Sequence, residues 1–182
     1  MDTMGHDSDL RIMLSGLSAL IGSWLYLFGL GQVYYAFKPS SVTIRNLVIV
    51  SFSAILMAYG VIHAAYLAIA TTAKIAIQNS LDLETTTLLA SQINKALRLL
   101  IYPIFALLSY LFISQVWRKQ THYPRWIILA FPLIPFLIRD VFRSILSGTA
   151  WVVVEGGYLN LLLVIFFTAS TIVLWNKSNA TQ

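Results

Sequence analysis

Four charged side chains interrupt apolar stretches of this sequence, and they are the residues best able to do chemistry. Arg139, Asp140 and Arg143 stand in one apolar run, and Glu155 stands in the next. A charge inside a membrane-length apolar run is costly, so it usually faces a protein interior or a wet cavity and indicates a functional site. On a helix, Arg139 and Arg143 share a face, and Asp140 pairs with Arg143. We therefore expect an ion pair between an arginine and a carboxylate of Asp140 or Glu155.

Three further polar residues are expected at a similar depth. His63 lies in an earlier apolar run between Tyr59 and Tyr66, Arg98 stands at the entrance of another, and Asn160 follows Glu155. Counted at about 1.5 Å per residue, these positions converge in the outer half of a bilayer. The predicted ligand-binding residues are therefore His63, Arg98, Arg139, Asp140, Arg143, Glu155 and Asn160. The alternative is a satisfied polar cluster that only fixes helix packing, because buried ion pairs often do no more.

The composition indicates what must position these residues. The 182-residue chain is 58% hydrophobic and 10% charged, with a mean hydropathy of +0.77. Soluble domains carry about 25% charged residues, so this chain lacks the charge that a water-facing surface needs. Its apolar residues also gather into runs of transmembrane length. We expect an all-α fold, a polytopic membrane helix bundle of five transmembrane helices.

The apolar runs predict one transmembrane bundle over residues 14–175, between a polar N-terminal tail (1–13) and a polar C-terminal tail (176–182). The five spans are expected at about 14–37, 47–73, 96–117, 126–147 and 150–175. Asp82 and Glu84 indicate a helix start, after which apolar residues recur every three or four positions. The third span is therefore expected to continue an amphipathic stretch on its N-terminal side. Pro132 and Pro135 free carbonyls in the fourth span, which neighbouring groups must satisfy.

The net charge of +5 does not indicate nucleic-acid binding, because the basic residues are spread along the chain and concentrate at span ends. Such residues set membrane topology and contact lipid headgroups. With five spans, one side collects Lys38, Arg45, Arg118, Lys119, Arg125 and Lys177. We therefore expect a multi-pass protein of the cell (inner) membrane, with its N-terminus outside and its C-terminus cytoplasmic.

No motif of known chemistry stands in the chain. Cysteine is absent and the three histidines fall in different regions, so we expect no metal and no cofactor, and we assign no catalytic residue. One alternative is a membrane-embedded lipid or isoprenoid enzyme in which His63, Asp140 and Glu155 shuttle protons, as in membrane sterol isomerases.

The first span carries a row of small residues that favours close helix packing. Ser15, Ala19 and Ser23 recur every four positions, a spacing that lets another helix approach closely. A helix–helix partner could bind there. The corresponding alternative function is a structural subunit of a larger membrane complex.

Two short motifs resemble those of a known family. The first is Thr121-His122-Tyr123-Pro124-Arg125-Trp126, and the second runs from Gly157-Tyr158-Leu159-Asn160-Leu161 to Leu174-Trp175. With them the chain resembles an uncharacterised family of bacterial multi-pass membrane proteins, a domain of unknown function. The resemblance implies a small helical membrane protein and supplies no catalytic residue.

The residues and this resemblance together favour one function. We expect a small integral membrane protein that binds a lipid-like or amphipathic ligand in a polar pocket, and carries or senses it. Its other expected partners are the surrounding membrane lipids.

Overall fold

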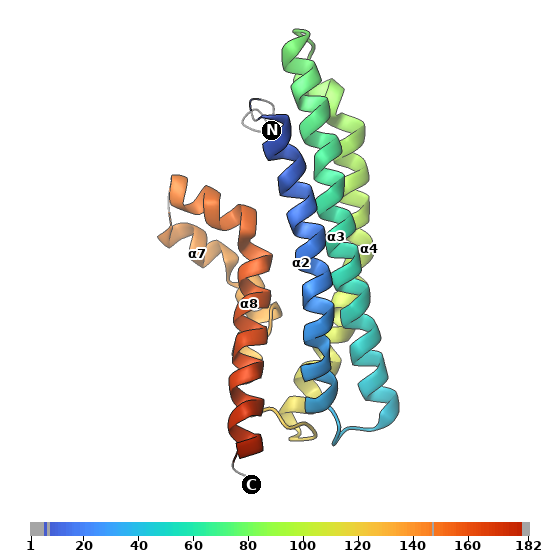
Figure 1. The fold of residues 1–182 in the computed structure, drawn as a ribbon, viewed down its shortest axis with the longest axis vertical. Coiled ribbons are helices and arrows are strands. Elements are labelled where there is room, and N and C mark those ends of the chain that lie inside the picture. Colours follow the sequence, from blue (N-terminus) through green and yellow to red (C-terminus); the bar gives the residue numbers. More distant parts are fainter. Residues whose placement is uncertain (1–5, 7, 147, 180–182) are drawn as a thin grey trace. The chain divides into compact units, whose positions relative to one another are not determined.

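The computed structural model describes residues 6, 8–146 and 148–179, with the backbone alone for residues 149–153, 155, 156, 178 and 179. This described part is helical, with turns and loops but no strand (Figure 1). Its helices are α2 (Asp9–Ala36), α3 (Val42–Gln78), α4 (Leu83–Trp117), α5 (Ile127–Ala130), α6 (Leu133–Leu137), α7 (Arg139–Ile145) and α8 (Thr149–Asn179). The predicted all-α class is confirmed.

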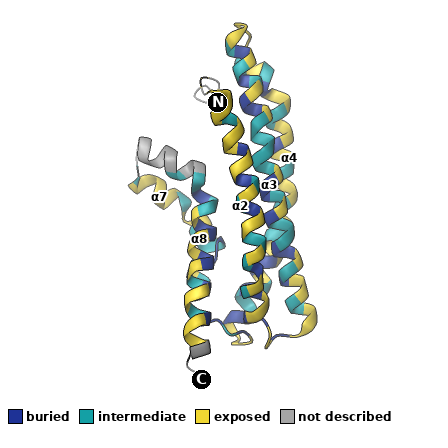
Figure 2. Cartoon of the chain, in the orientation of Figure 1, coloured by how far each residue is buried: buried dark blue, intermediate teal, exposed yellow. Residues whose placement is uncertain are grey.

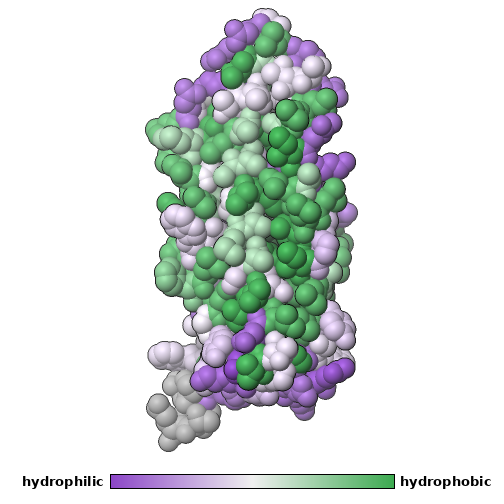
Figure 3. All heavy atoms as spheres, turned by 90° about the vertical axis from the view of Figure 1, so that its right-hand side faces the viewer, coloured by the Kyte–Doolittle hydropathy of each residue, from purple (hydrophilic) through white to green (hydrophobic). Residues whose placement is uncertain are grey.

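Four helices in the described residues are long and apolar enough to cross a membrane. They are α2, α3, α4 and the part of α8 from Gly157 to Lys177. The face drawn in Figure 3 is covered largely by hydrophobic side chains, with hydrophilic ones gathered toward its ends. The expected helical extension before the third span is present, because α4 runs without interruption from Leu83 through Pro103 to Trp117.

The predicted fourth span, 126–147, is not one helix. The chain forms α5, α6 and α7 there, which have four, five and seven residues. Phe131 is extended, with ψ of 133°, because the ring of Pro132 disfavours helical backbone in the residue before it. A second break falls at Ile138, with φ of −96° and ψ of 15°. The count of five membrane helices is therefore not confirmed.

The residues that immediately precede α2, α3 and α4 cap the N-termini of these helices with their side chains. The hydroxyl of Ser8 accepts a hydrogen bond from the Arg11 backbone N–H at 3.3 Å. A carboxylate oxygen of Asp82 accepts one from Thr85 N–H at 2.7 Å, and Ser41 accepts one from Ile44 N–H at 3.4 Å. Such caps satisfy backbone donors that have no partner within the helix. The predicted helix start at Asp82 is confirmed.

The chain forms two compact units. Unit 1 comprises Met1–Phe28 and Val50–Leu107, and unit 2 comprises Gly29–Ile49 and Leu108–Gln182. The divisions fall inside α2, α3 and α4. In each unit, buried positions alternate along the helices with exposed ones, as the colours of Figure 2 show. The expectation of a single bundle over residues 14–175 stays a prediction.

Candidate functional site

Unit 1 contains a group of polar residues that we call the cluster: Tyr59 and His63 in the middle of α3, and Asn94 on α4. Tyr59 is buried, and its ring centroid lies 4.4 Å from that of the half-buried His63, edge to face. Tyr66, one turn further along α3, lies 6.0 Å from the same imidazole. This spacing follows from the helix, because residues three and four apart are neighbours on its surface. His63 is thus held between two aromatic rings, as the sequence spacing predicted.

Asn94 joins the cluster from α4. Its side chain is 1% exposed, and its amide nitrogen donates a hydrogen bond to the carbonyl of Ile62, beside His63, at 3.2 Å. The amide oxygen of Asn94 is buried and has no hydrogen-bond partner among the residues that the structure describes. A buried acceptor left without a donor costs about 1–3 kcal/mol. Asn94 could not be predicted as a site residue from the sequence, since a single polar residue in a helix of mixed polarity is common.

The small residues predicted to form a packing seam hold α2 against α3 inside unit 1. Ala19 and Ser23 are buried, while Ser15 is exposed. A Cβ added to Gly60 of α3 would meet the Ser23 hydroxyl at 2.7 Å. Ala19 and Ser23, two of the three small residues, are therefore buried by packing within the chain itself. Binding of an outside partner at Ser15 stays a prediction.

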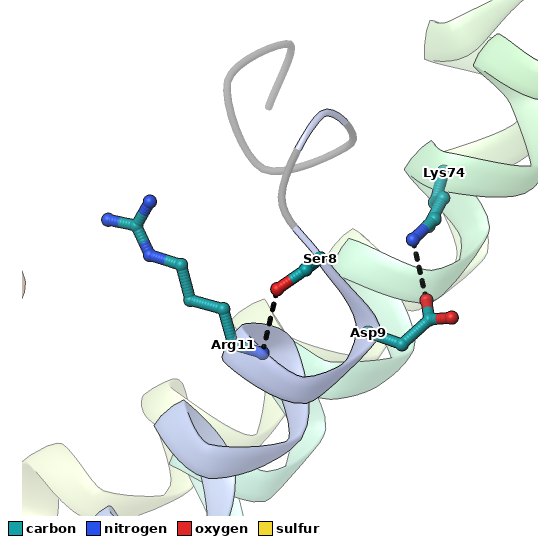
Figure 4. A network of polar contacts seen from close by, with 4 residues as sticks. All are labelled: Ser8, Asp9, Arg11 and Lys74. Atoms are coloured by element: carbon teal, nitrogen blue, oxygen red, sulfur yellow. Dashed lines mark hydrogen bonds and ion pairs between the residues drawn. The ribbon is translucent and has the colours of Figure 1, made fainter.

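An ion pair joins α2 and α3 at one end of unit 1. The Lys74 ammonium on α3 lies 2.6 Å from a carboxylate oxygen of Asp9 on α2, and Figure 4 shows it beside the Ser8 cap. The carboxylate is 90% exposed, and exposed pairs contribute about 0–1 kcal/mol. This contact aligns the helix ends and adds little stability.

Unit 2 contains the segment in which the sequence resembles the known family. The backbone N–H of His122 donates to the carbonyl of Ala36 at 2.7 Å, and the Ser40 hydroxyl donates to the carbonyl of Gln120 at 2.7 Å. The loop after α4 is therefore joined to the loop after α2. The family motif at residues 121–126 lies in this junction.

Tyr123 anchors the junction in an aromatic core. Its ring lies 5.7 Å from Phe112 and 6.4 Å from Phe166, and its hydroxyl is 2.7 Å from that of Ser170 on α8. Burial raises the pKa of Tyr123, although the hydrogen bond with Ser170 opposes this effect. The phenol is thus a neutral structural group at ordinary pH.

His122 stands at the surface of the same junction, close to the last turns of α8. Its Nδ1 lies 3.0 Å from the ammonium of Lys177. An ammonium only donates, so Nδ1 accepts and the ring proton of the neutral imidazole lies on Nε2. Burial first, and then the charges of Lys177 and Lys38, lower the pKa of His122.

Three cation–aromatic contacts surround the junction. Lys38 lies over Tyr35, Arg45 over Tyr34, and Arg125 over Trp117, each cation at 4.7–5.0 Å from the ring centroid. We call this part of unit 2 the basic end; it comprises Lys38, Arg45, Arg118, Lys119, Arg125 and Lys177. Aromatic and basic residues together are typical of a membrane interface.

The predicted binding residues fall in both units. His63 and Arg98 belong to unit 1, and Arg139, Asp140, Arg143, Glu155 and Asn160 belong to unit 2. Arg98, Asp140 and Arg143 are exposed, whereas Arg139 and Asn160 are half-buried. The side chain of Glu155 lies outside the described residues. The convergence of all seven into one pocket stays a prediction.

The expected ion pair between an arginine and the carboxylate of Asp140 or Glu155 can be checked only in part. Asp140 and Arg143 are both described and both exposed, and no ion pair joins these two. Pairing through Glu155 lies outside the described residues. In the part of the chain that the structure describes, no three His, Cys, Asp or Glu side chains gather in a way that could hold a metal. A proton-shuttling role for His63, Asp140 and Glu155 stays a hypothesis.

Comparison with known proteins gives a family and no function. No curated protein and no solved structure matches the chain significantly. The model of a family of unknown function, DUF6796, matches residues 2–177 and so covers nearly the whole chain, including the cluster of unit 1 and the junction of unit 2. The chain belongs to this family of unknown function.

Proposed function

We propose that this chain is an integral membrane protein that binds a lipid-like or amphipathic molecule, and carries or senses it. The observation that carries the proposal is the buried amide oxygen of Asn94, which has no donor among the described residues, while the amide nitrogen bonds the carbonyl of Ile62. Buried acceptors are nearly always paired with a protein group or with ordered water. A hydroxyl, amine or amide group of a ligand would supply the missing donor.

The surroundings of Asn94 favour an amphipathic ligand over a polar solute. The cluster lies well inside α3 and α4, two helices of membrane-crossing length. Neighbouring side chains on these helices are apolar and exposed, among them Met57, Val61 and Leu99. A molecule that reaches Asn94 from the bilayer would keep its apolar part in contact with such side chains. His63 can donate or accept a second hydrogen bond to its polar group.

Native mass spectrometry of gently extracted protein tests this proposal. We expect a lipid-sized adduct on the wild-type chain and its loss in Asn94→Leu, which removes the acceptor at similar volume. Gln92→Leu is the matched control, because it removes an exposed amide from the same helix and should leave the adduct unchanged. Wild-type protein without an adduct, or equal adducts on both variants, would contradict the proposal.

We also propose that the N-terminus lies outside the cell membrane and the C-terminus in the cytoplasm. The support is the basic end, whose six Lys and Arg residues come from the loops after α2 and α4, the start of α3 and the end of α8. Such residues near span ends favour the cytoplasmic side. In a chain without cysteine, His6→Cys should react with an impermeant maleimide on intact cells, and Ser178→Cys should not. The reverse labelling pattern would overturn this orientation.

A further inference from the structure

Helix α7 separates apolar from polar side chains along its length. Its apolar face comprises Val141, Phe142 and Ile145, with Ile138 at the preceding cap position; these side chains are 36–71% exposed. At about 100° per residue, Arg139, Asp140, Arg143 and Ser144 occupy the opposite face. Three of the four charged residues that interrupt the apolar stretches of the sequence thus share one side of a short amphipathic helix.

Contacts within unit 2 place α7 near one end of an apolar stretch of α8. The ring of Phe142 lies 6.3 Å from that of Tyr158, whose hydroxyl donates to the carbonyl of Pro135 at 2.6 Å. The charge-free stretch of α8 runs between Glu155 and Lys177. Its length is about 30 Å, the thickness of a bilayer core. Tyr158 therefore lies near one boundary of that core, and α7 packs beside it.

The bilayer itself can reach the apolar face of α7. Farther along α8 from Tyr158, Leu161, Val164 and Ile165 are about half exposed, as expected for side chains that contact lipid in a membrane-crossing helix. In Figure 1, α7 runs across the direction of this part of α8. A helix with this orientation at the core boundary presents one face to acyl chains and the other to headgroups.

We propose that α7 is an interfacial helix that lies in the plane of the membrane, at the end of α8 opposite Lys177. Its apolar face is buried about 5–10 Å into the boundary between headgroups and acyl chains. Arg143 and the neighbouring charges on the opposite face contact lipid phosphates and water, so none of them has to remain in hydrocarbon. This proposal does not depend on the cluster of unit 1.

Spin labels on single cysteines test this placement, since the chain has no cysteine of its own. The variants are Val141→Cys on the apolar face, Ser144→Cys on the polar face and Val164→Cys on α8 as the hydrocarbon reference. All three positions are exposed, so the substitutions should not disturb folding; equal unfolding temperatures check this. Each variant is placed in vesicles of phosphatidylcholine and phosphatidylglycerol, and collisions with oxygen and with a water-soluble nickel chelate are measured.

We expect the label at position 141 to collide several-fold more with oxygen, relative to the chelate, than the label at position 144. Its depth should fall between those of positions 144 and 164. If positions 141 and 144 both matched position 164, α7 would cross the hydrocarbon. If both met the chelate equally, α7 would lie in water. If position 141 met neither collider, protein would cover it. Each of these results overturns the proposal.

Discussion

The polar cluster of unit 1 and the junction of unit 2 use similar residue types in opposite ways. In the junction, the hydroxyl of Tyr123, the backbone N–H of His122 and the hydroxyl of Ser40 each have a partner. In the cluster, the buried acceptor of Asn94 has none among the described residues, although in unit 2 the Arg45 Nε, the Ser109 hydroxyl and the Gln115 amide oxygen have none either. Paired polar groups specify how a chain folds, whereas each buried group without a partner needs an explanation of its own. The contacts of residues 121–126 therefore give this segment a role in the fold, whereas binding of a ligand at Asn94 is our proposal.

The largest loss of stability should follow from removal of the Tyr123 side chain from the junction. Tyr123→Ala removes an aromatic ring that is 4% exposed and the partner of Ser170. We expect a loss of about 3–5 kcal/mol, as for other buried aromatic residues, measured by thermal unfolding in detergent. Tyr110→Ala is the control, because Tyr110 is 67% exposed. Equal losses in both variants would show that the junction is not a stabilising core.

A smaller loss is expected where α2 approaches α3. A Cβ on Gly60 would lie 2.7 Å from the Ser23 hydroxyl, so Gly60→Val should push the helices apart. Overpacking of this kind costs about 1–3 kcal/mol. Gly22→Ala, at which an added Cβ meets nothing within 4 Å, should be neutral or stabilising, because alanine favours helix. A neutral Gly60→Val would refute the close packing.

Asn94→Leu, in the cluster of unit 1, should affect stability differently from the substitutions in the junction. The change removes the unpaired acceptor of Asn94 but also its hydrogen bond to the Ile62 carbonyl. The first effect offsets the second, which is about 0.5–1.5 kcal/mol, so we expect the unfolding temperature of ligand-free protein to stay nearly the same. Tyr123→Phe, by contrast, leaves the buried Ser170 hydroxyl unpaired and should lower it. A large loss of stability in Asn94→Leu would make Asn94 a structural residue like those of the junction.

The smallest expected effect is the pH dependence of stability that arises from His122 in the junction. Burial, then Lys177 and Lys38, lower the pKa of His122 from its ordinary 6.5, so the unfolded chain takes up this proton first. The stabilisation is therefore complete above about pH 6.5 and is lost as the pH falls towards the folded pKa. Lys177→Met should raise the pKa of His122 and reduce this loss, as measured by NMR titration and unfolding on both sides of pH 6.5. Lys119→Met should leave the titration unchanged.

The long helices could be predicted from the sequence because hydropathy over about 20 residues depends on local composition alone. The start of α4 was readable for the same reason, since Asp82 caps the helix three residues before Thr85. The break in the predicted fourth span could not be predicted from length, because an apolar run from 126 to 147 is long enough to cross a membrane as one helix. The extended backbone that Pro132 imposes on Phe131 outweighs that length.

The candidate site was predicted only where neighbours are close in the sequence. His63 contacts Tyr59 and Tyr66 through helical spacing, so their grouping followed from the residues. The contact of Asn94 with Ile62 joins two helices, and no spacing rule anticipates it. The same limit applies to Ser23, whose four-residue pattern indicated close packing without identifying Gly60 as the partner. Pairing between helices depends on tertiary structure, which one sequence does not specify.

The broken segment also bears on how the chain enters the membrane. None of α5, α6 and α7, with four, five and seven residues, approaches the roughly 20 residues that an independently inserting helix needs. Its described contacts, from Pro135 to Tyr158 and from α5 to α8, are made to a helix that the ribosome synthesises later. These contacts can therefore form only after α8 has been synthesised, so the segment reaches its final position in the fold later than the helices that precede it.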